Sequence, residues 1–155
     1  MTGEFDEAKR AVDEWQRMLS ANKPENILHP IQLSPEGWMC LRGSLEGVAL
    51  WGIYAGGMSS DTYSDAEIDL IHEMWNRFPE QYGEIEVSGK EAALIGKSFK
   101  LEAERNLEYS IPTYEEVLQL YAYTFFDLTN HLSNFGVQAD PELVAYFQGI
   151  QRRTI

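Results

Sequence analysis

Two aspartate–histidine pairs are the residues of this sequence best suited to holding a metal ion. Asp69 and His72 are three residues apart, and Asp127 and His131 are four apart, so each pair shares one side of a predicted helix. Such pairs on facing helices are one way in which helical bundles bind metals. In the segment DAEIDLIHEMW, however, Asp69 and His72 fall on the polar side, which favours a solvated face. Metal binding is therefore the alternative hypothesis, and the leading expectation is that the protein uses no cofactor.

Motifs for nucleophilic or nucleotide chemistry are not found in the sequence. Cys40 is the single cysteine, and it lies in the apolar run WMCL, where free cysteines are usually core residues. Neither Gly-x-Ser-x-Gly nor His-Glu-x-x-His occurs. The glycine-rich stretch Gly52 to Gly57 lacks the lysine of a phosphate-binding loop, and no basic residue occurs between Arg42 and Arg77. These patterns favour a protein that is not an enzyme.

Acidic charge is the main property that the sequence offers to a partner. The chain has 25 acidic and 12 basic residues, for a formal net charge of −13. Phosphate backbones and anionic membranes repel such a chain, so we expect no direct binding to nucleic acid and none to membranes. A basic protein is the favoured partner, because opposite electrostatic fields speed encounter.

The longest acidic run, residues 61–86, contains Arg77 as its one positive charge. Its carboxylates are the predicted partner contacts. They are Asp61, Asp65, Glu67, Asp69, Glu73, Glu80, Glu84 and Glu86.

Two aromatic residues are added to this predicted interface. Tyr123 and Phe126 fall outside the apolar stripe of the helix predicted over residues 113–134. Aromatic side chains flanked by acids are typical of interface hot spots. The other interpretation is that both rings pack against a further helix or a second copy of the chain, which leaves a homodimer open.

Helical periodicity and capping residues predict the elements that position these side chains. The predicted helices cover residues 2–21, 64–78, 88–107, 113–134 and 140–153. Three of them begin with capping-box spacing, in which Ser or Thr precedes Glu by three residues. These pairs are Ser64–Glu67, Ser88–Glu91 and Thr113–Glu116. Gly136 is placed to end the fourth of these helices.

Residues 34–57 leave two structures open. Ser34 and Pro35 favour a helix start, and Leu41, Leu45 and Val48 recur on one side of that helix. Six glycines in this segment each weaken a helix by about 1 kcal/mol, so a small β-hairpin around residues 38–55 is the rival. The helix is the favoured prediction.

These elements predict a mainly α, compact, bundle-like domain of four to six helices, a single acidic helical domain over residues 1–155. The single cysteine excludes an internal disulfide and fits a reducing compartment. The polar start MTGEFDEAKR does not read as a signal peptide, and the longest apolar stretch is too short to cross a bilayer. We therefore expect a cytoplasmic protein.

The sequence thus favours a non-enzymatic acidic interaction protein that binds and occludes a basic surface of a partner protein. Inhibitors, immunity proteins against a toxin and phage-encoded anti-defence proteins belong to this class, and mimicry of nucleic acid is conceivable for them. The partner would be a basic protein, such as a nucleic-acid-binding protein or a toxin. The alternative is a metal-assisted helix-bundle enzyme that uses the two Asp/His pairs.

Overall fold

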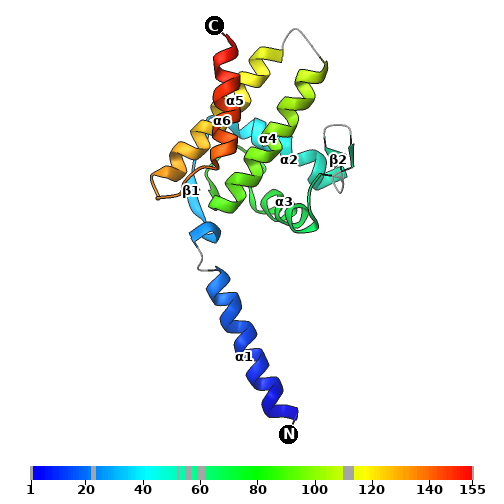
Figure 1. Cartoon of the computed structure of the whole chain (residues 1–155), viewed down its shortest axis with the longest axis vertical. Helices are drawn as coiled ribbons and strands as arrows, with labels where there is room; N and C mark the ends of the chain where they lie inside the picture. Colours follow the sequence, from blue (N-terminus) through cyan, green and yellow to red (C-terminus); the bar gives the residue numbers. More distant parts are fainter. Residues whose placement is uncertain are drawn as a thin grey trace.

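The computed structural model describes residues 2–21, 24–51, 53–54, 57–58, 62–109 and 114–154 (Figure 1). Six α-helices account for most of this part of the chain, which confirms the predicted fold class. They are α1 (Thr2–Ala21), α2 (Pro35–Glu46), α3 (Asp65–Arg77), α4 (Gly89–Tyr109), α5 (Tyr114–Ser133) and α6 (Pro141–Gln151).

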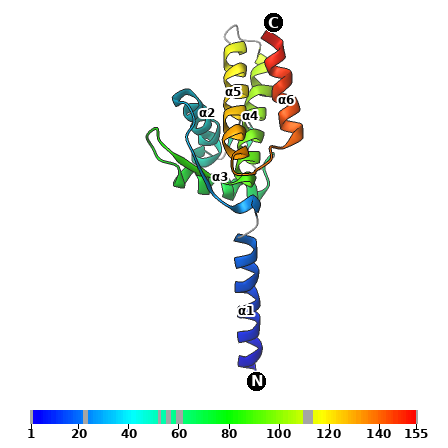
Figure 2. The same cartoon turned by 90° about the vertical axis from the view of Figure 1, so that its left-hand side faces the viewer.

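The core lies between α4, α5 and α6, with α2 packed against α4 and α5 (Figures 1 and 2). Phe99 of α4, Phe125 of α5 and Phe147 of α6 are the largest fully buried side chains. The rings of Phe125 and Phe147 are stacked with their centroids 4.6 Å apart. Full burial of a side chain of this kind stabilises a fold by about 1.5–3 kcal/mol, so these rings are major anchors of the bundle.

A glycine brings α4 close to its two neighbours. A Cβ atom on Gly96 would lie 2.7 Å from Leu143 Cδ1 and 3.0 Å from Phe125 Cε2. The first distance is shorter than real carbon contacts, so a larger residue at position 96 would require the Leu143 side chain or the helices themselves to shift.

The predicted capping residues begin and end the helices as expected. Ser64 Oγ accepts a hydrogen bond from Glu67 N at 3.1 Å, and Ser88 Oγ accepts one from Glu91 N at 3.1 Å. Gly136 follows α5 with a φ of +80°, a left-handed conformation that glycine adopts readily. Thr113, of the third predicted capping box, lies outside the described residues.

Residues 34–58 combine the two structures that the sequence left open. Helix α2 begins as predicted but ends at Glu46, and a π-helical turn follows over Gly47–Trp51. The hairpin comes after the helix rather than replacing it. Strands β2 (Ile53–Tyr54) and β3 (Gly57–Met58) pair antiparallel, so the hairpin predicted around residues 38–55 lies at 53–58.

A second antiparallel strand pair joins the connector after α1 to the segment before α4. Strand β1 (His29–Ile31) pairs with β4 (Ile85–Val87), with Ile31 opposite Ile85. Ile31, Ile85 and Val87 are all buried. This pairing fixes the acidic segment that follows α3 against the core.

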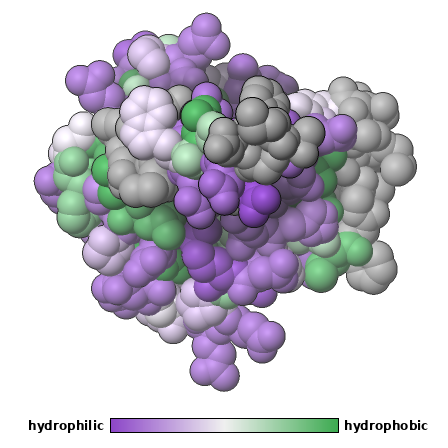
Figure 3. Space-filling view, turned by 90° about the horizontal axis from the view of Figure 1, so that it is seen from below, coloured by the Kyte–Doolittle hydropathy of each residue, from purple (hydrophilic) through white to green (hydrophobic). Residues whose placement is uncertain are grey.

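Helix α1 stands apart from the other helices (Figures 1 and 2). Its predicted span of residues 2–21 is confirmed, but every side chain from Asp6 to Gln16 is exposed. Val12 and Trp15, on its apolar side, are 50% and 61% exposed. Seen from below, the described surface is mostly hydrophilic with separate apolar patches (Figure 3). No helix among the described residues is long and apolar enough to cross a membrane.

Candidate functional site

The outer side of α3 carries a row of carboxylates. Asp65, Asp69 and Glu73 follow one another at four-residue intervals and all are exposed. Ile71 and Met74, on the opposite side, are fully buried. Residues four apart are neighbours on a helix surface, so burial of the apolar side turns the three carboxylates together toward solvent.

The segment after α3 continues this acidic surface. Glu80, Glu84 and Glu86 are exposed. In β4 the burial alternates, with Ile85 and Val87 inside and Glu86 outside, as the period of a strand requires. We call the six exposed carboxylates of α3 and this segment the acidic face. Its members are Asp65, Asp69, Glu73, Glu80, Glu84 and Glu86.

The acidic face has no internal counter-charge. Arg77 is the only cation between residues 62 and 86, and its Nη2 lies 2.7 Å from Glu91 Oε1. Glu91 is only 3% exposed, and Arg77 Nη2 also donates a hydrogen bond to the main-chain oxygen of Glu86. Arg77 therefore serves the packing of α3 on α4. Within the described part of the chain, none of the six carboxylates of the acidic face forms an ion pair.

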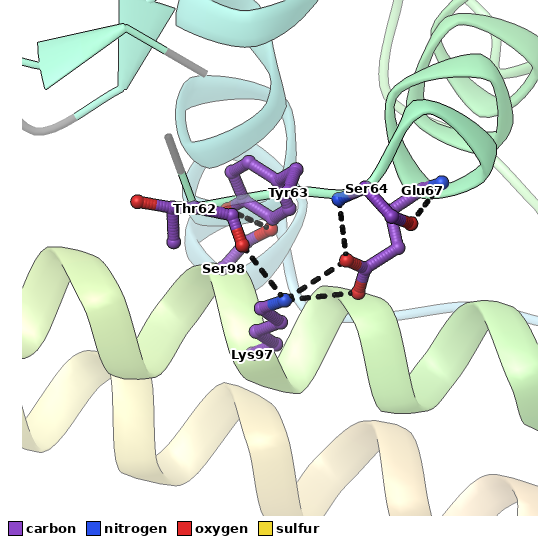
Figure 4. A network of polar contacts seen from close by, with 6 residues as sticks. All are labelled: Thr62, Tyr63, Ser64, Glu67, Lys97 and Ser98. Carbon is purple, nitrogen blue, oxygen red and sulfur yellow. Dashed lines mark hydrogen bonds and ion pairs between the residues drawn. The ribbon is translucent and has the colours of Figure 1, made fainter. Parts of the chain in front are cut away.

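Glu67, also predicted as a partner contact, takes part in contacts within the fold. Its Oε1 accepts a hydrogen bond from Ser64 N at 2.9 Å, and Lys97 Nζ lies 3.0 Å from both of its carboxylate oxygens (Figure 4). Burial opposes ionisation, but the hydrogen bonds from Ser64 and Lys97 and the charge of Lys97 outweigh it and lower the pKa of Glu67. Glu67 is thus neutralised by α4 and contributes little to the acidic face.

Lys97 is the central cation of this network, and the sequence analysis did not single it out. Its Nζ also donates to the main-chain oxygen of Thr62 at 3.2 Å and lies 5.0 Å from the ring centre of Tyr63 (Figure 4). The Tyr63 hydroxyl in turn is 3.0 Å from Ser98 Oγ. Only the packing of α3 against α4 brings these groups together, and no local sequence pattern joins positions 30 or more residues apart.

The remaining predicted contacts are placed differently. Asp61 lies outside the described residues. Tyr123 is 55% exposed on α5, as expected, whereas Phe126 is half-buried against the core with its ring 5.3 Å from that of Phe125. Helix α3 packs mainly on α2, the π-helical turn and α4. Among the described elements, Tyr123 is therefore not brought beside the acidic face.

The two Asp/His pairs lie on different helices and do not converge. Asp127 Oδ1 and His131 Nε2 are 3.4 Å apart on α5, while Asp69 and His72 are both exposed on α3. Within the described ranges, no three His, Cys, Asp or Glu side chains lie close enough together to hold a metal ion. The structure thus offers these four residues no shared metal site.

Cys40 has the environment of a core thiol. It is half-buried and packs against the core, and burial raises its pKa to about 11, partly offset by a hydrogen bond with Thr124. A thiol with such a pKa is protonated at neutral pH and is a poor nucleophile.

The concave surface between the first turn of α3, α4 and the start of α6 is mixed in charge. A groove of about 520 Å³ is lined by Lys90, Lys97 and Lys100 of α4 and by acidic residues that begin α3 and α6. The α4 spacing of seven and three residues could have revealed the lysine row in the sequence. The neighbouring acids, Glu67, Asp140 and Glu142, balance this positive charge.

No protein-family model, curated protein or solved structure matches the chain. The chemistry of the described surface is therefore the basis for a functional proposal. That surface carries an unneutralised row of carboxylates and histidines that do not converge on a common site.

Proposed function

We propose that this protein is a non-enzymatic interaction protein whose acidic face binds and occludes a basic surface of a partner protein. The observation that supports this proposal is the missing counter-charge. Six exposed carboxylates occur within residues 65–86, and Arg77, the one cation of that stretch, is engaged by buried Glu91.

The spacing of the acids favours a partner that supplies the missing charge. Like charges four residues apart on a helix destabilise it by roughly 0.2–0.5 kcal/mol per pair. Asp65 with Asp69, and Asp69 with Glu73, are two such pairs on α3. Lysines or arginines from a partner would turn this repulsion into attraction, and desolvation at the interface would strengthen it.

The partner class that fits is a basic protein, such as a toxin or a nucleic-acid-binding protein. A row of carboxylates along a helix would occupy a cleft built for phosphates, which is the mechanism of an inhibitor, an immunity protein or an anti-defence protein. The single free cysteine supports placing this encounter in the reducing cytoplasm.

The first experiment identifies the partner. The intact protein is immobilised, and proteins retained at low salt and released at high salt are identified by mass spectrometry. We expect a basic protein, because an interface made of exposed charges weakens as ionic strength rises. Retention of acidic or uncharged partners alone, with no effect of salt, would contradict the proposal.

The second experiment compares two variants that lose the same charge. The test variant neutralises four carboxylates of the acidic face: Asp69→Asn, Glu73→Gln, Glu84→Gln and Glu86→Gln. The control variant neutralises four exposed carboxylates elsewhere: Glu25→Gln, Glu46→Gln, Glu116→Gln and Glu142→Gln. We expect the test variant to bind the identified partner about tenfold or more weakly, and the control to change affinity much less. Equal losses would mean that net charge, and not this face, drives binding.

A further inference from the structure

The apolar side of α1 is a second surface that the acidic face does not explain. All side chains from Asp6 to Gln16 are exposed, including Val12 and the indole of Trp15. Most helical stability in proteins comes from packing of an amphipathic side rather than from intrinsic helix propensity. Covering Val12 and Trp15 would therefore stabilise α1.

The spacing of the apolar residues is that of a coiled-coil seam. Phe5, Ala8, Val12, Trp15 and Leu19 are separated by three, four, three and four residues. These are the a and d positions of a heptad repeat, the pattern by which one helix packs along another.

The positions beside this seam favour a second copy of the same helix. With Phe5 at a, Glu4 occupies a g position and Lys9 the e position of the next heptad. In a parallel pair, the g position of one helix faces the e position of the next heptad on the other. The sequence thus places Glu4 of each copy opposite Lys9 of the other, which gives one attractive pair on each side of the seam.

The distribution of charge also separates α1 from the acidic face. Helix α1 has five acidic and three basic residues, so it contributes only −2 to the net charge of −13. A basic partner would be drawn to the rest of the molecule, whereas two α1 helices repel each other weakly. We call the rest of each copy, residues 24–154, its acidic body. Repulsion between two acidic bodies is largely screened beyond the Debye length, which is about 8 Å at physiological salt.

We propose that two copies of this protein associate through α1, in a parallel pair of helices joined along the apolar side that carries Ala8, Val12 and Trp15. The dimer holds both acidic bodies at one end of the paired helices and leaves both acidic faces available. A partner with two basic sites, or two copies of a partner, would then be bound with an increased effective concentration.

Mass measurement over a wide concentration range tests this pairing. As protein concentration rises, we expect the mass to increase from 17.7 kDa, the monomer, to twice that value. The measurement uses enough salt to screen the repulsion between the two acidic bodies. The variant Val12→Ser/Trp15→Ser changes two exposed positions of α1 and should remain monomeric. The matched control Arg10→Ser/Glu14→Ser makes two serine substitutions on the other side of α1 with no change in net charge, and it should dimerise.

Exchanging the charges of Glu4 and Lys9 tests whether the two helices are parallel and whether the helix that covers α1 is a second copy of it. Lys9→Glu should weaken dimerisation several-fold, and adding Glu4→Lys should restore it, because the exchanged pair attracts again. Three results would overturn the proposal. They are a monomer at all concentrations, a dimer that persists in Val12→Ser/Trp15→Ser, and a Lys9→Glu variant that dimerises as well as the intact protein.

Discussion

Lys97 Nζ of α4 lies 3.0 Å from both carboxylate oxygens of Glu67, in the first turn of α3. Glu67 also accepts a hydrogen bond from Ser64 N, so one side chain closes the capping box and joins two helices. We expect Glu67→Gln to lower the free energy of unfolding by about 1 kcal/mol at neutral pH, after allowance for solvent screening of this partly exposed pair. Urea denaturation measures the change.

The same pair predicts how this difference depends on pH. The pKa of Glu67 is lowered in the folded protein from its usual value of 4.5. Its contribution is therefore fully present above pH 4.5 and is lost as pH falls through the lower folded-state pKa. The stability difference between the intact protein and Glu67→Gln should narrow over that acidic range. The same measurement on Glu46→Gln, which removes an exposed carboxylate outside this network, is the control. A Glu67→Gln difference that is constant with pH would contradict the role of the charge.

Gly96 is predicted to be intolerant of any side chain. Alanine favours a helix over glycine by about 1 kcal/mol, but a Cβ at position 96 would lie 2.7 Å from Leu143 Cδ1 and 3.0 Å from Phe125 Cε2. Overpacking of this kind typically costs about 1–3 kcal/mol, so Gly96→Ala should destabilise the protein. Gly43 is the matched control, since a Cβ there meets nothing within 4 Å and alanine should stabilise α2. Thermal unfolding of both variants should shift in opposite directions, and a shift in the same direction would contradict this packing.

The helices were predictable because their start signals are local. Ser64 and Glu67, three residues apart, specify the first turn of α3 wherever it packs. Gly136 similarly marks the end of α5 through its φ of +80°. The end of α2 was harder to predict, because the glycines after Glu46 weaken a helix without specifying whether a turn or a strand follows.

The candidate site was predictable only in part, because its charge balance depends on distant residues. Outward placement of Asp65, Asp69 and Glu73 follows from the helical pattern of α3 alone. That Glu67 is paired with Lys97, and Arg77 with Glu91, depends on how α3 packs against α4. The exposure of Trp15 likewise could not be read from its apolar pattern, since that pattern fits both a buried helix and an unpartnered one.

Cys40 should react slowly with thiol reagents. Burial raises its pKa to about 11, so almost no thiolate is present at pH 8, and its half-buried position limits access. We expect alkylation by iodoacetamide to be much slower than that of free cysteine at pH 8, and to accelerate as pH approaches 11. Cys40→Ser supplies the unreactive control. A rate equal to that of free cysteine at pH 8 would show that Cys40 is an accessible, reactive thiol.

A single substitution at Asp69 is expected to change stability and partner binding in opposite directions. It lies between Asp65 and Glu73 on the exposed side of α3, and so belongs to two like-charged pairs. Asp69→Lys converts both pairs to attractive ones and should stabilise the protein by roughly 1–2 kcal/mol at low salt. The gain should fade as salt rises, because exposed charges are screened.

The same substitution should weaken binding to a basic partner, since it places a like charge in the interface. Glu46→Lys, another exposed reversal of charge, should affect binding much less. Calorimetric unfolding and binding to the partner, both measured at low and high salt, provide the comparison. If Asp69→Lys destabilised α3, the carboxylate would be serving the fold. The mutual repulsion within the acidic face would then no longer argue that a basic partner neutralises it.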